Sequence, residues 1–259
     1  MEFDAKVEAC LEEARQGFNE DCEPTLTEDG TSGAYIIRNS AGAVAVFKPI
    51  DEEPFAPNNP RGMKGLFGSE TCRAGVKSGE STLREVAAYL IDHNGFSGVP
   101  ATSLVLIQHD SLPSTFIEED QVLNQEHLEL IQGVIPIHRT DESDKFSRIS
   151  EVSENSVSTN QTEDNISEYS SKIPKVGSLQ SFVKSMGPIE NFSSDLFSPD
   201  EIHKIAVLDL RILNLDRNTD NILVQRQGQE YRLVPIDHGL SIPDSLEVCS
   251  YDLAWLGYE

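Results

Sequence analysis

The chain has few cysteines and no long apolar run. Its 259 residues include four cysteines, which lie far apart and form no Cys-x-x-Cys pair. This spacing argues against a zinc site or a disulfide framework and is typical of a reducing compartment. No stretch approaches the roughly 20 apolar residues that a membrane span requires, and the N-terminus lacks the features of a signal peptide. These absences predict a cytoplasmic protein without a transmembrane segment, at most peripheral to a membrane.

Basic residues are also scarce. The chain has 20 Lys and Arg against 44 Asp and Glu, which gives a formal net charge of −24. Such a chain repels nucleic acid and bare anionic bilayers unless its bases are concentrated locally. The composition therefore argues against a nucleic-acid partner. One local concentration lies in the Pro/Asn/Gly-rich segment 52–79, which contains Arg61, Lys64, Arg73 and Lys77.

Hydrophobic periodicity predicts ordered elements in the first half of the chain. Apolar residues at helical spacing indicate an amphipathic helix within residues 1–28, followed by an acidic linker. The β-prone runs 35–37 and 44–47 predict a hairpin, and 99–108 contains another strand. Apolar residues at i, i+3, i+4 and i+7 predict a helix over 83–91.

Residues 118–172 have a different character, because they are acidic and serine-rich and contain few apolar residues. Such a segment cannot support a packed core, so we expect a disordered surface insert. A regulatory phosphorylation segment is the alternative.

The remaining sequence, 173–259, predicts a helix that begins after Ser198-Pro199 and a hairpin with strands at 222–224 and 231–236. We therefore predict an α+β, two-lobed protein-kinase-like fold. A β-rich N-lobe would span residues 29–117, and the hinge and a helical, partial C-lobe would span 173–259.

Two polar motifs in the C-terminal part have the spacing of a phosphotransferase site. Asp216 and Asn221 reproduce the D-x-x-x-x-N catalytic loop, in which the Asp serves the acceptor hydroxyl and the Asn binds metal. Asp237 follows a short apolar run in an Asp-x-Gly motif, where a kinase places its second metal-binding Asp. Each motif alone is weak, since polar turns are common. The Asp216-Arg217 order also departs from the Arg-Asp order of protein kinases.

Two further motifs lie upstream, in the order that kinases use. Backbone amides of Gly30, Thr31, Ser32 and Gly33 could cover phosphates, although a plain hairpin turn has the same composition. Lys48 ends an apolar strand, where a kinase places its ATP lysine. The alternative is a lysine whose ammonium group reaches the surface.

The carboxylate partner of Lys48 is open at this point. Glu85 has the expected place in a helix, but helical spacing puts it nearly opposite the apolar stripe, and Thr82-x-x-Glu85 is also typical of a capping box. Glu52 and Glu53 follow Lys48 closely and compete for the role. All the motifs in this order predict a kinase-type site for ATP and Mg²⁺.

Several long runs of the sequence match one enzyme family. They are Gly30-Thr31-Ser32-Gly33-Ala34-Tyr35, Val44-Ala45-Val46-Phe47-Lys48-Pro49, Asp51-Glu52-Glu53-Pro54-Phe55-Ala56-Pro57-Asn58-Asn59-Pro60, Arg84-Glu85-Val86-Ala87-Ala88-Tyr89-Leu90, Lys175-Val176-Gly177-Ser178-Leu179-Gln180-Ser181-Phe182-Val183 and Val207-Leu208-Asp209-Leu210-Arg211-Ile212-Leu213-Asn214. In these runs the chain resembles the type II phosphatidylinositol 4-kinases, and most of all the gamma class first defined in plants.

The resemblance implies transfer of the γ-phosphate of ATP to the 4-hydroxyl of phosphatidylinositol in membranes. It implies a catalytic role for Asp216 and Mg²⁺ ligation by Asn221 and Asp237. The implied adenine-contacting hinge is Gln180, Ser181, Phe182 and Val183. The residues implied to lie near the lipid headgroup are Glu53, Pro54 and Phe55.

The chain also departs from the family pattern. Where animal type II enzymes carry a cysteine-rich palmitoylation cassette, this loop holds only Cys72. The family continues well past the Asp-x-Gly strand, so we expect a C-terminally truncated fold. A protein Ser/Thr kinase, which would have protein substrates, is one alternative function. A catalytically weak, nucleotide-binding pseudokinase or scaffold is another.

Overall fold

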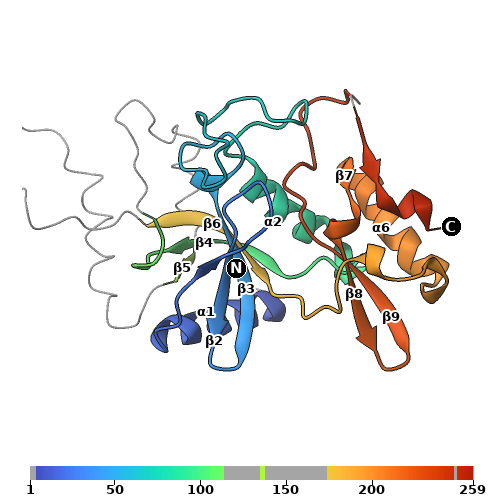
Figure 1. Cartoon of the computed structure of the whole chain (residues 1–259), viewed down its shortest axis with the longest axis horizontal. Coiled ribbons are helices and arrows are strands. Elements are labelled where there is room, and N and C mark those ends of the chain that lie inside the picture. The colour runs from blue at the N-terminus through green and yellow to red at the C-terminus, as the bar shows by residue number, and fades with distance from the viewer. Residues whose placement is uncertain (1–3, 114–134, 138–173, 248–249, 259) are drawn as a thin grey trace, which may run out of the picture.

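The computed structural model describes residues 4–113, 135–137, 174–247 and 250–258. Helices and sheets are mixed along the chain, and a sheet-rich part precedes a part with one long helix and a hairpin (Figure 1). Six short 3₁₀ helices complete the described structure: η1 (Ile50–Glu52), η2 (His93–Gly95), η5 (Ile189–Asn191), η6 (Ser194–Leu196), η7 (Thr219–Asn221) and η8 (Ala254–Gly257). Among the described residues, no helix combines the length and apolar character needed to cross a membrane.

A six-stranded sheet forms the centre of the N-terminal part. In spatial order its strands are β1 (Thr25–Leu26), β2 (Tyr35–Asn39), β3 (Gly42–Pro49), β6 (Lys175–Ser181), β4 (Thr102–Ile107) and β5 (Ile135–Ile137). Neighbouring strands are antiparallel except β4 and β5. The predicted hairpin is confirmed, because β2 and β3 pair with Tyr35 opposite Phe47. Strand β6, distant in sequence, completes the sheet centre between β3 and β4.

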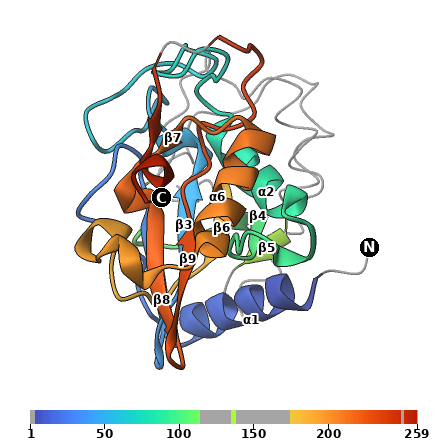
Figure 2. The ribbon, with the colours of Figure 1, turned by 90° about the vertical axis from the view of Figure 1, so that its right-hand side faces the viewer.

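The predicted N-terminal helix is α1 (Ala5–Asn19), which lies across the strands (Figure 2). Its buried apolar residues share one core with residues of β2, β3, β4 and β6. Gly17 faces the sheet, and a Cβ at this position would lie 1.9 Å from the Arg38 carbonyl oxygen. The close approach of helix and strand therefore requires glycine here. The helix belongs to the core of the sheet.

The helix predicted over 83–91 is confirmed as α2 (Ser81–Ile91), but the expected orientation of its apolar stripe is wrong. Leu90 is 68% exposed, whereas Thr82, Arg84 and Glu85 are buried with Ala88. The polar side faces inward because these side chains form hydrogen bonds and ion pairs with the sheet and the C-terminal part. Tertiary pairing decided the orientation of this helix.

The expectation of disorder over 118–172 is wrong for one short piece. Strand β5 lies in this segment and extends the sheet beside β4, with Ile137 fully buried. Pro136 is compatible with the strand because an edge position leaves one side without a ladder bond. The rest of the segment, 118–134 and 138–172, lies outside the described residues.

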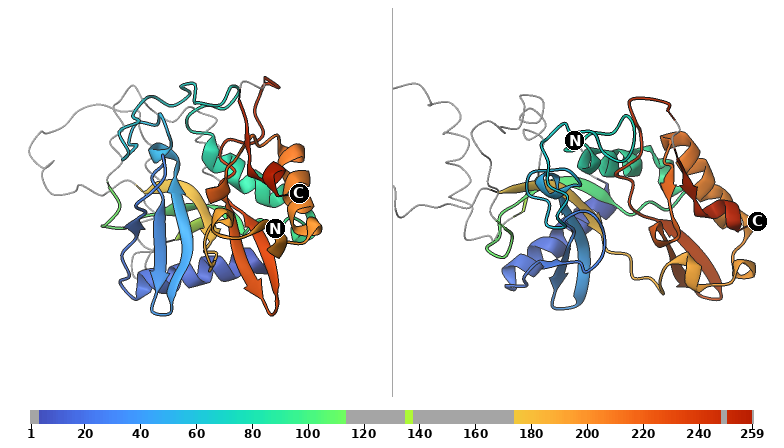
Figure 3. Two further views of the ribbon diagram at one scale, coloured as in Figure 1. Left: turned by 45° about the vertical axis from the view of Figure 1, so that its right-hand side comes forward. Right: turned by 45° about the horizontal axis from the view of Figure 1, so that its top comes forward.

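The C-terminal part contains the other predicted elements. The helix expected after Ser198 is α6 (Pro199–Ile212), and the hairpin is β8 (Ile222–Gln227) with β9 (Glu230–Pro235). Two short parallel strands, β7 (Asp216–Arg217) and β10 (Asp252–Leu253), also pair. The hairpins β2–β3 and β8–β9 project on the same side of the molecule (Figure 3). A core of Ile189, Phe197, Ile202, Ile205, Ile222, Val224 and Leu233 joins α6 to the second hairpin.

Candidate active site

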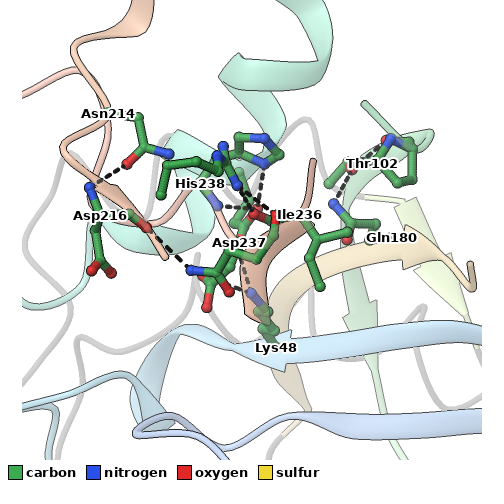
Figure 4. Close-up of polar contacts among 12 residues, drawn as sticks. Lys48, Thr102, Gln180, Asn214, Asp216, Ile236, Asp237 and His238 are labelled. Atoms are coloured by element: carbon green, nitrogen blue, oxygen red, sulfur yellow. Dashed lines mark hydrogen bonds and ion pairs between the residues drawn. The ribbon is translucent and has the colours of Figure 1, made fainter. Parts of the chain in front are cut away.

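Lys48 lies next to the end of strand β3 and reaches two carboxylates from distant parts of the chain. Its Nζ lies 2.5 Å from Glu85 Oε1 on α2 and 3.1 Å from Asp237 Oδ1 in the loop after β9 (Figure 4). Of the three glutamates that the sequence left as alternatives, Glu85 is therefore the partner of Lys48. The lysine side chain is 21% exposed and that of Glu85 3%. Lys48 holds together the sheet, α2 and the Asp-x-Gly loop.

The charges of this cluster stabilise one another. Burial disfavours the charged form of Lys48, but the carboxylates of Asp237 and Glu85 outweigh it and raise the lysine pKa. Burial likewise opposes ionisation of Glu85, and the Lys48 charge with the His238 hydrogen bond lowers the pKa of Glu85 well below its usual range. Both groups are therefore charged at neutral pH, and Lys48 presents a fixed positive charge.

Glu85 also fixes the backbone of the Asp-x-Gly motif. Its Oε2 accepts a hydrogen bond from the backbone N–H of His238 at 3.0 Å and lies 3.4 Å from Nδ1 of that ring. His238 is fully buried, and burial lowers its pKa. Asp237 has a φ of 55°, a left-handed conformation that costs free energy for a non-glycine residue. The bond from His238 to Glu85 stabilises this turn and presents the Asp237 side chain to Lys48.

The predicted catalytic loop lies at the end of α6. Asn214 Oδ1 accepts from the backbone N–H of Asp216 at 3.1 Å, and Asn221 Nδ2 donates to the Asp216 carbonyl at 3.2 Å. The Asp216 side chain lines the same cleft as Lys48 and Asp237. Burial and then the charges of Asp237 and Asp252 raise the pKa of Asp216. A carboxylate with a raised pKa is a better proton acceptor.

A buried arginine connects this loop to the Asp-x-Gly strand. Arg217 is fully buried, and its guanidinium contacts the Asp209 carboxylate of α6, with Nη2 3.0 Å from Oδ1. Its Nη1 donates to the carbonyls of Asn221, at 2.9 Å, and Ile236. One side chain thus holds the residue Asn221 and the residue before Asp237. Sequence reasoning noted Arg217 for its unusual order after Asp216 and missed this function.

The glycine loop, residues 30–33, lies between β1 and β2 at the edge of the same cleft. Thr31 and Ser32 line the cleft, and Gly30 has a φ of 101° in open space. The backbone N–H of Gly33 donates to the Glu52 carbonyl at 2.9 Å. The loop is therefore anchored at Gly33, and its residues Thr31 and Ser32 line the same cleft as Lys48.

The predicted hinge, residues 180–183, leads out of β6 towards the C-terminal part. The N–H of Phe182 donates to the Val44 carbonyl at 2.9 Å, and that of Ser181 donates to the Ala101 carbonyl at 2.8 Å. Gln180 points to Thr102 (Figure 4). The cleft around Lys48 is not lined by these four residues, so the structure does not bring them together with the charged cluster.

The two glutamates that competed with Glu85 have other partners. Glu53 is buried, and its carboxylate accepts from the backbone N–H groups of Gly79, Ser81 and Thr82 at 2.7–3.1 Å. A carboxylate at a helix N-terminus satisfies donors that have no partner within the helix. Glu53 is therefore a cap of α2, and Glu52 pairs elsewhere.

The segment expected near a lipid headgroup lies only partly on the cleft. Glu53 and Pro54 line it, whereas Phe55 is half-buried with a φ of 63°. Because the Glu53 carboxylate is engaged by α2, headgroup contact remains a prediction for this segment.

The chain is similar to known proteins over most of its length. The sequence profile of the family described as phosphatidylinositol 3- and 4-kinase matches residues 31–254. Phosphatidylinositol 4-kinase gamma 4 of Oryza sativa subsp. japonica is 34% identical over 246 residues, which cover 90% of this chain and 33% of the relative. Phosphatidylinositol 4-kinase gamma 3 of Arabidopsis thaliana is 32% identical over 257 residues, covering 93% of this chain and 36% of the relative. The chain spans about a third of the length of these relatives.

Proposed function

Because this chain belongs to the phosphatidylinositol 3- and 4-kinase family, we propose that it transfers the γ-phosphate of ATP to the 4-hydroxyl of phosphatidylinositol. The family has a kinase-like fold, and ATP is the phosphate donor of such enzymes. The observation that carries the proposal is the position of Lys48, paired with Glu85 and Asp237 in a cleft that Asp216 also lines. This arrangement joins a fixed cation, a proton acceptor and an oxygen ligand in one place.

Each residue of the cleft has a role in the proposed reaction. Lys48 holds the α- and β-phosphates, and amides of the glycine loop cover the phosphate chain. Asp216 accepts the proton of the 4-hydroxyl while the oxygen of that hydroxyl forms a bond to the γ-phosphorus. The bond from the γ-phosphorus to the β–γ bridging oxygen breaks at the same time, and ADP leaves. Residues 180–183 contact the adenine.

Asp237 and Asn221 fit a Mg²⁺ site by their donor atoms. The Asp237 side chain is 53% exposed. The Nδ2 of Asn221 donates to the Asp216 carbonyl, so the amide oxygen of Asn221 is the atom that could bind the ion. Mg²⁺ takes oxygen donors of this kind. When bound, the ion would neutralise charge on the transferred phosphate. Lys48 must then share Asp237 with the ion.

We place the two lobes of this kinase-like fold on either side of residues 182–188. The N-lobe would consist of the six-stranded sheet with α1 and α2, and the partial C-lobe of α6, β8 and β9. Support comes from an apolar core within each part, and a smaller core of Ala88, Val99, Leu208 and Ile212 packs α2 against α6. Residues 182–188 connect the two parts, and the predicted hinge, residues 180–183, lies where β6 leads into this connection.

The enzyme would meet its lipid through peripheral membrane contact. Lys64 and Lys77 are exposed in the segment 52–79, and Leu66 in the same segment is 55% exposed. Basic and apolar side chains next to the cleft suit an anionic bilayer surface. Arg73 of the predicted basic patch is buried and would not contribute.

A transfer assay with γ-phosphate-labelled ATP tests the proposal. Phosphatidylinositol vesicles and a protein acceptor are offered in parallel, and Asp237→Ala serves as the inactive control. Label in the 4-phosphate of the lipid, lost in the control and without Mg²⁺, is the expected result. Label in the protein acceptor alone would establish a protein kinase instead. Nucleotide binding without any transfer would establish the nucleotide-binding scaffold.

A further inference from the structure

A second buried lysine lies one strand away from Lys48. Lys175 begins β6, and its Nζ lies 2.6 Å from Asp51 Oδ2 and 2.6 Å from Glu52 Oε1. The exposed fractions of the three side chains are 1%, 6% and 0%. Isolated charges so deeply buried are strongly unfavourable, so the cluster depends on its internal pairing.

Further hydrogen bonds complete the cluster around Glu52. Tyr35, the first residue of β2, donates its hydroxyl to Glu52 Oε2 at 2.8 Å. Burial and the neighbouring carboxylate raise the pKa of Tyr35, which keeps this hydroxyl a donor. Asn58 Nδ2 donates to Asp51 Oδ2 at 2.9 Å. Both carboxyl oxygens of Glu52 are therefore directed by side chains from β2 and β6, and the glutamate has one fixed position.

The glycine loop rests on this glutamate. The Gly33 N–H donates to the Glu52 carbonyl, and a Cβ at position 33 would lie 2.1 Å from Glu52 Oε2 and 2.7 Å from Glu52 Cβ. Asn59 bridges the two segments, because its Nδ2 donates to the Thr31 carbonyl at 2.8 Å and to the Glu52 carbonyl at 3.1 Å. The height of the loop above the sheet is thus set by contact with Glu52.

We propose that Glu52, held by Lys175 and Tyr35, is a positioning residue that sets the glycine loop over the phosphates of the nucleotide. The inference rests on the proposed function, since it assigns the loop to ATP phosphates. Glu52 itself contacts no substrate. Glu52 acts through its contact with Gly33 of the loop, whereas Lys48 would contact the phosphates directly.

A purely structural role would make a different prediction. If the cluster only stabilised the fold, its variants would lower stability and affect every ligand alike. A positioning role affects the phosphate end of the nucleotide and spares the adenine end, which residues 180–183 hold independently. Comparison of ATP with adenosine, which lacks phosphates, separates the two roles.

The test uses three variants of the full chain and one control. Gly33→Ala forces the loop away from Glu52, Glu52→Gln removes the charge, and Tyr35→Phe removes a single hydroxyl with the smallest risk to folding. Asp92→Asn is the control, because Asp92 is a buried carboxylate that accepts the N–H groups of Ser97 and Val99 far from the loop. Binding of Mg·ATP and of adenosine is measured by calorimetry, with the unfolding midpoint of each variant.

Gly33→Ala and Glu52→Gln should weaken Mg·ATP by about tenfold or more, equal to about 1.4 kcal/mol, and change adenosine affinity by less than about twofold. Tyr35→Phe should follow in the same direction with a smaller effect, and Asp92→Asn should leave the ratio of the two affinities unchanged. An unchanged ratio in Gly33→Ala and Tyr35→Phe would overturn the positioning role. If the wild-type chain bound no Mg·ATP, the proposed function itself would fail, which is a distinct result.

Discussion

Two lysines on adjacent strands, the half-buried Lys48 and the buried Lys175, form similar ion pairs in different surroundings. Lys48 on β3 opens onto the cleft, and its carboxylates come from α2 and from the loop after β9. Lys175 on β6 is sealed, and both of its carboxylates come from η1, directly after β3. The exposed fractions of the two side chains are 21% and 1%. In the proposed function the half-buried Lys48 is accessible to a phosphate, whereas the fully buried side chain of Lys175 is not.

The comparison shows how chemistry and support are divided. Lys48 has partners from two distant elements, so its ion pairs form only where β3, α2 and the loop after β9 meet. A lysine with local partners fixes one corner of the sheet. The charge type is the same, and access to solvent decides which lysine can serve a substrate.

The largest effect is expected on the cleft side. Asp216→Ala and Asp237→Ala should each reduce phosphate transfer by about 10³-fold or more, since each removes a proton acceptor or an oxygen ligand. Asp237→Ala should also weaken Mg·ATP more than Asp216→Ala does. Initial rates and calorimetry measure the two effects.

Asp220→Ala is the matched control for these changes, because Asp220 is exposed in the same loop. It should retain full activity. If either test variant transferred phosphate near the wild-type rate, the substituted residue would have no catalytic role, and the contrast between the two lysines would lose its basis.

Exchange of each lysine for methionine sharpens the comparison. Lys175→Met leaves two buried carboxylates without a cation and should cost about 3–5 kcal/mol of unfolding free energy. Lys48→Met should cost about 1–2 kcal/mol, because its site is partly open, while transfer falls by about 100-fold. Urea denaturation gives the free energies, with the exposed Lys184→Met as control.

The loss in Lys175→Met should depend on pH. Burial already raises the pKa of Glu52 in the intact cluster. A carboxyl with a raised folded-state pKa binds its proton more tightly in the folded chain, so its contribution to stability falls as pH rises. The loss should therefore be smaller at pH 5 than at pH 7. Equal stability of the two methionine variants at pH 7 would show that the lysines occupy equivalent sites.

An intermediate effect on stability is expected at Arg217, a fully buried cation that donates to the backbone carbonyls of Asn221 and of the residue before Asp237. Arg217→Lys keeps the charge but loses the paired contact with Asp209 and a carbonyl contact, and should cost about 2–3 kcal/mol. Transfer should also fall at temperatures where the variant is folded, because Asn221 and Asp237 lose their common support. Exposed Arg226→Lys is the control for both measurements. A stable variant with lost activity, or the reverse, would separate the two roles.

Much of the fold followed from local patterns, because strands β2, β3, β8 and β9 and the helices have clear periodicity within short windows. The short strand β5 was missed, since it contains Pro136, lies in a segment that is acidic and serine-rich overall, and pairs with β4 only through long-range contacts. The inward polar side of α2 was also missed. Glu85 faces inward because of Lys48, 37 positions away, which no local pattern records.

The site was predicted in part for the same reason. Asp216, Asn221 and Asp237 lie in motifs whose spacing is legible in the sequence. Lys175 begins a run that resembles the family and implied a hinge, but nothing in that run indicates ion pairs with Asp51 and Glu52, which lie beside it only in the folded chain. Sequence also could not decide between Glu52, Glu53 and Glu85, because all three are glutamates at plausible distances from Lys48.

The smallest effect is expected from Asp252, whose charge influences the pKa of Asp216. Asp252 pairs with Asp216 across β10 and β7, and its charge contributes to the raised pKa of Asp216. Because the ionised Asp216 is the proton acceptor in the proposed reaction, the rate should fall as pH falls through the pKa of Asp216. Asp252→Asn should therefore move the acidic limb of the kcat profile to lower pH, by less than about one pH unit. Asp195→Asn, far from the cleft, should leave the limb in place, and an upward movement in Asp252→Asn would contradict the assignment.

The central claim is that Lys48, and not Lys175, meets the phosphates of ATP. An acyl-phosphate derivative of ATP tests it directly, since such a probe transfers its acyl group to a lysine amine beside the bound phosphates. Digestion and mass spectrometry then identify the modified lysine. The account predicts acylation at Lys48 that excess ATP suppresses, with Lys175 unmodified in the folded chain. Acylation of Lys175 in the folded chain, or modification of Lys48 that ATP does not suppress, would contradict it.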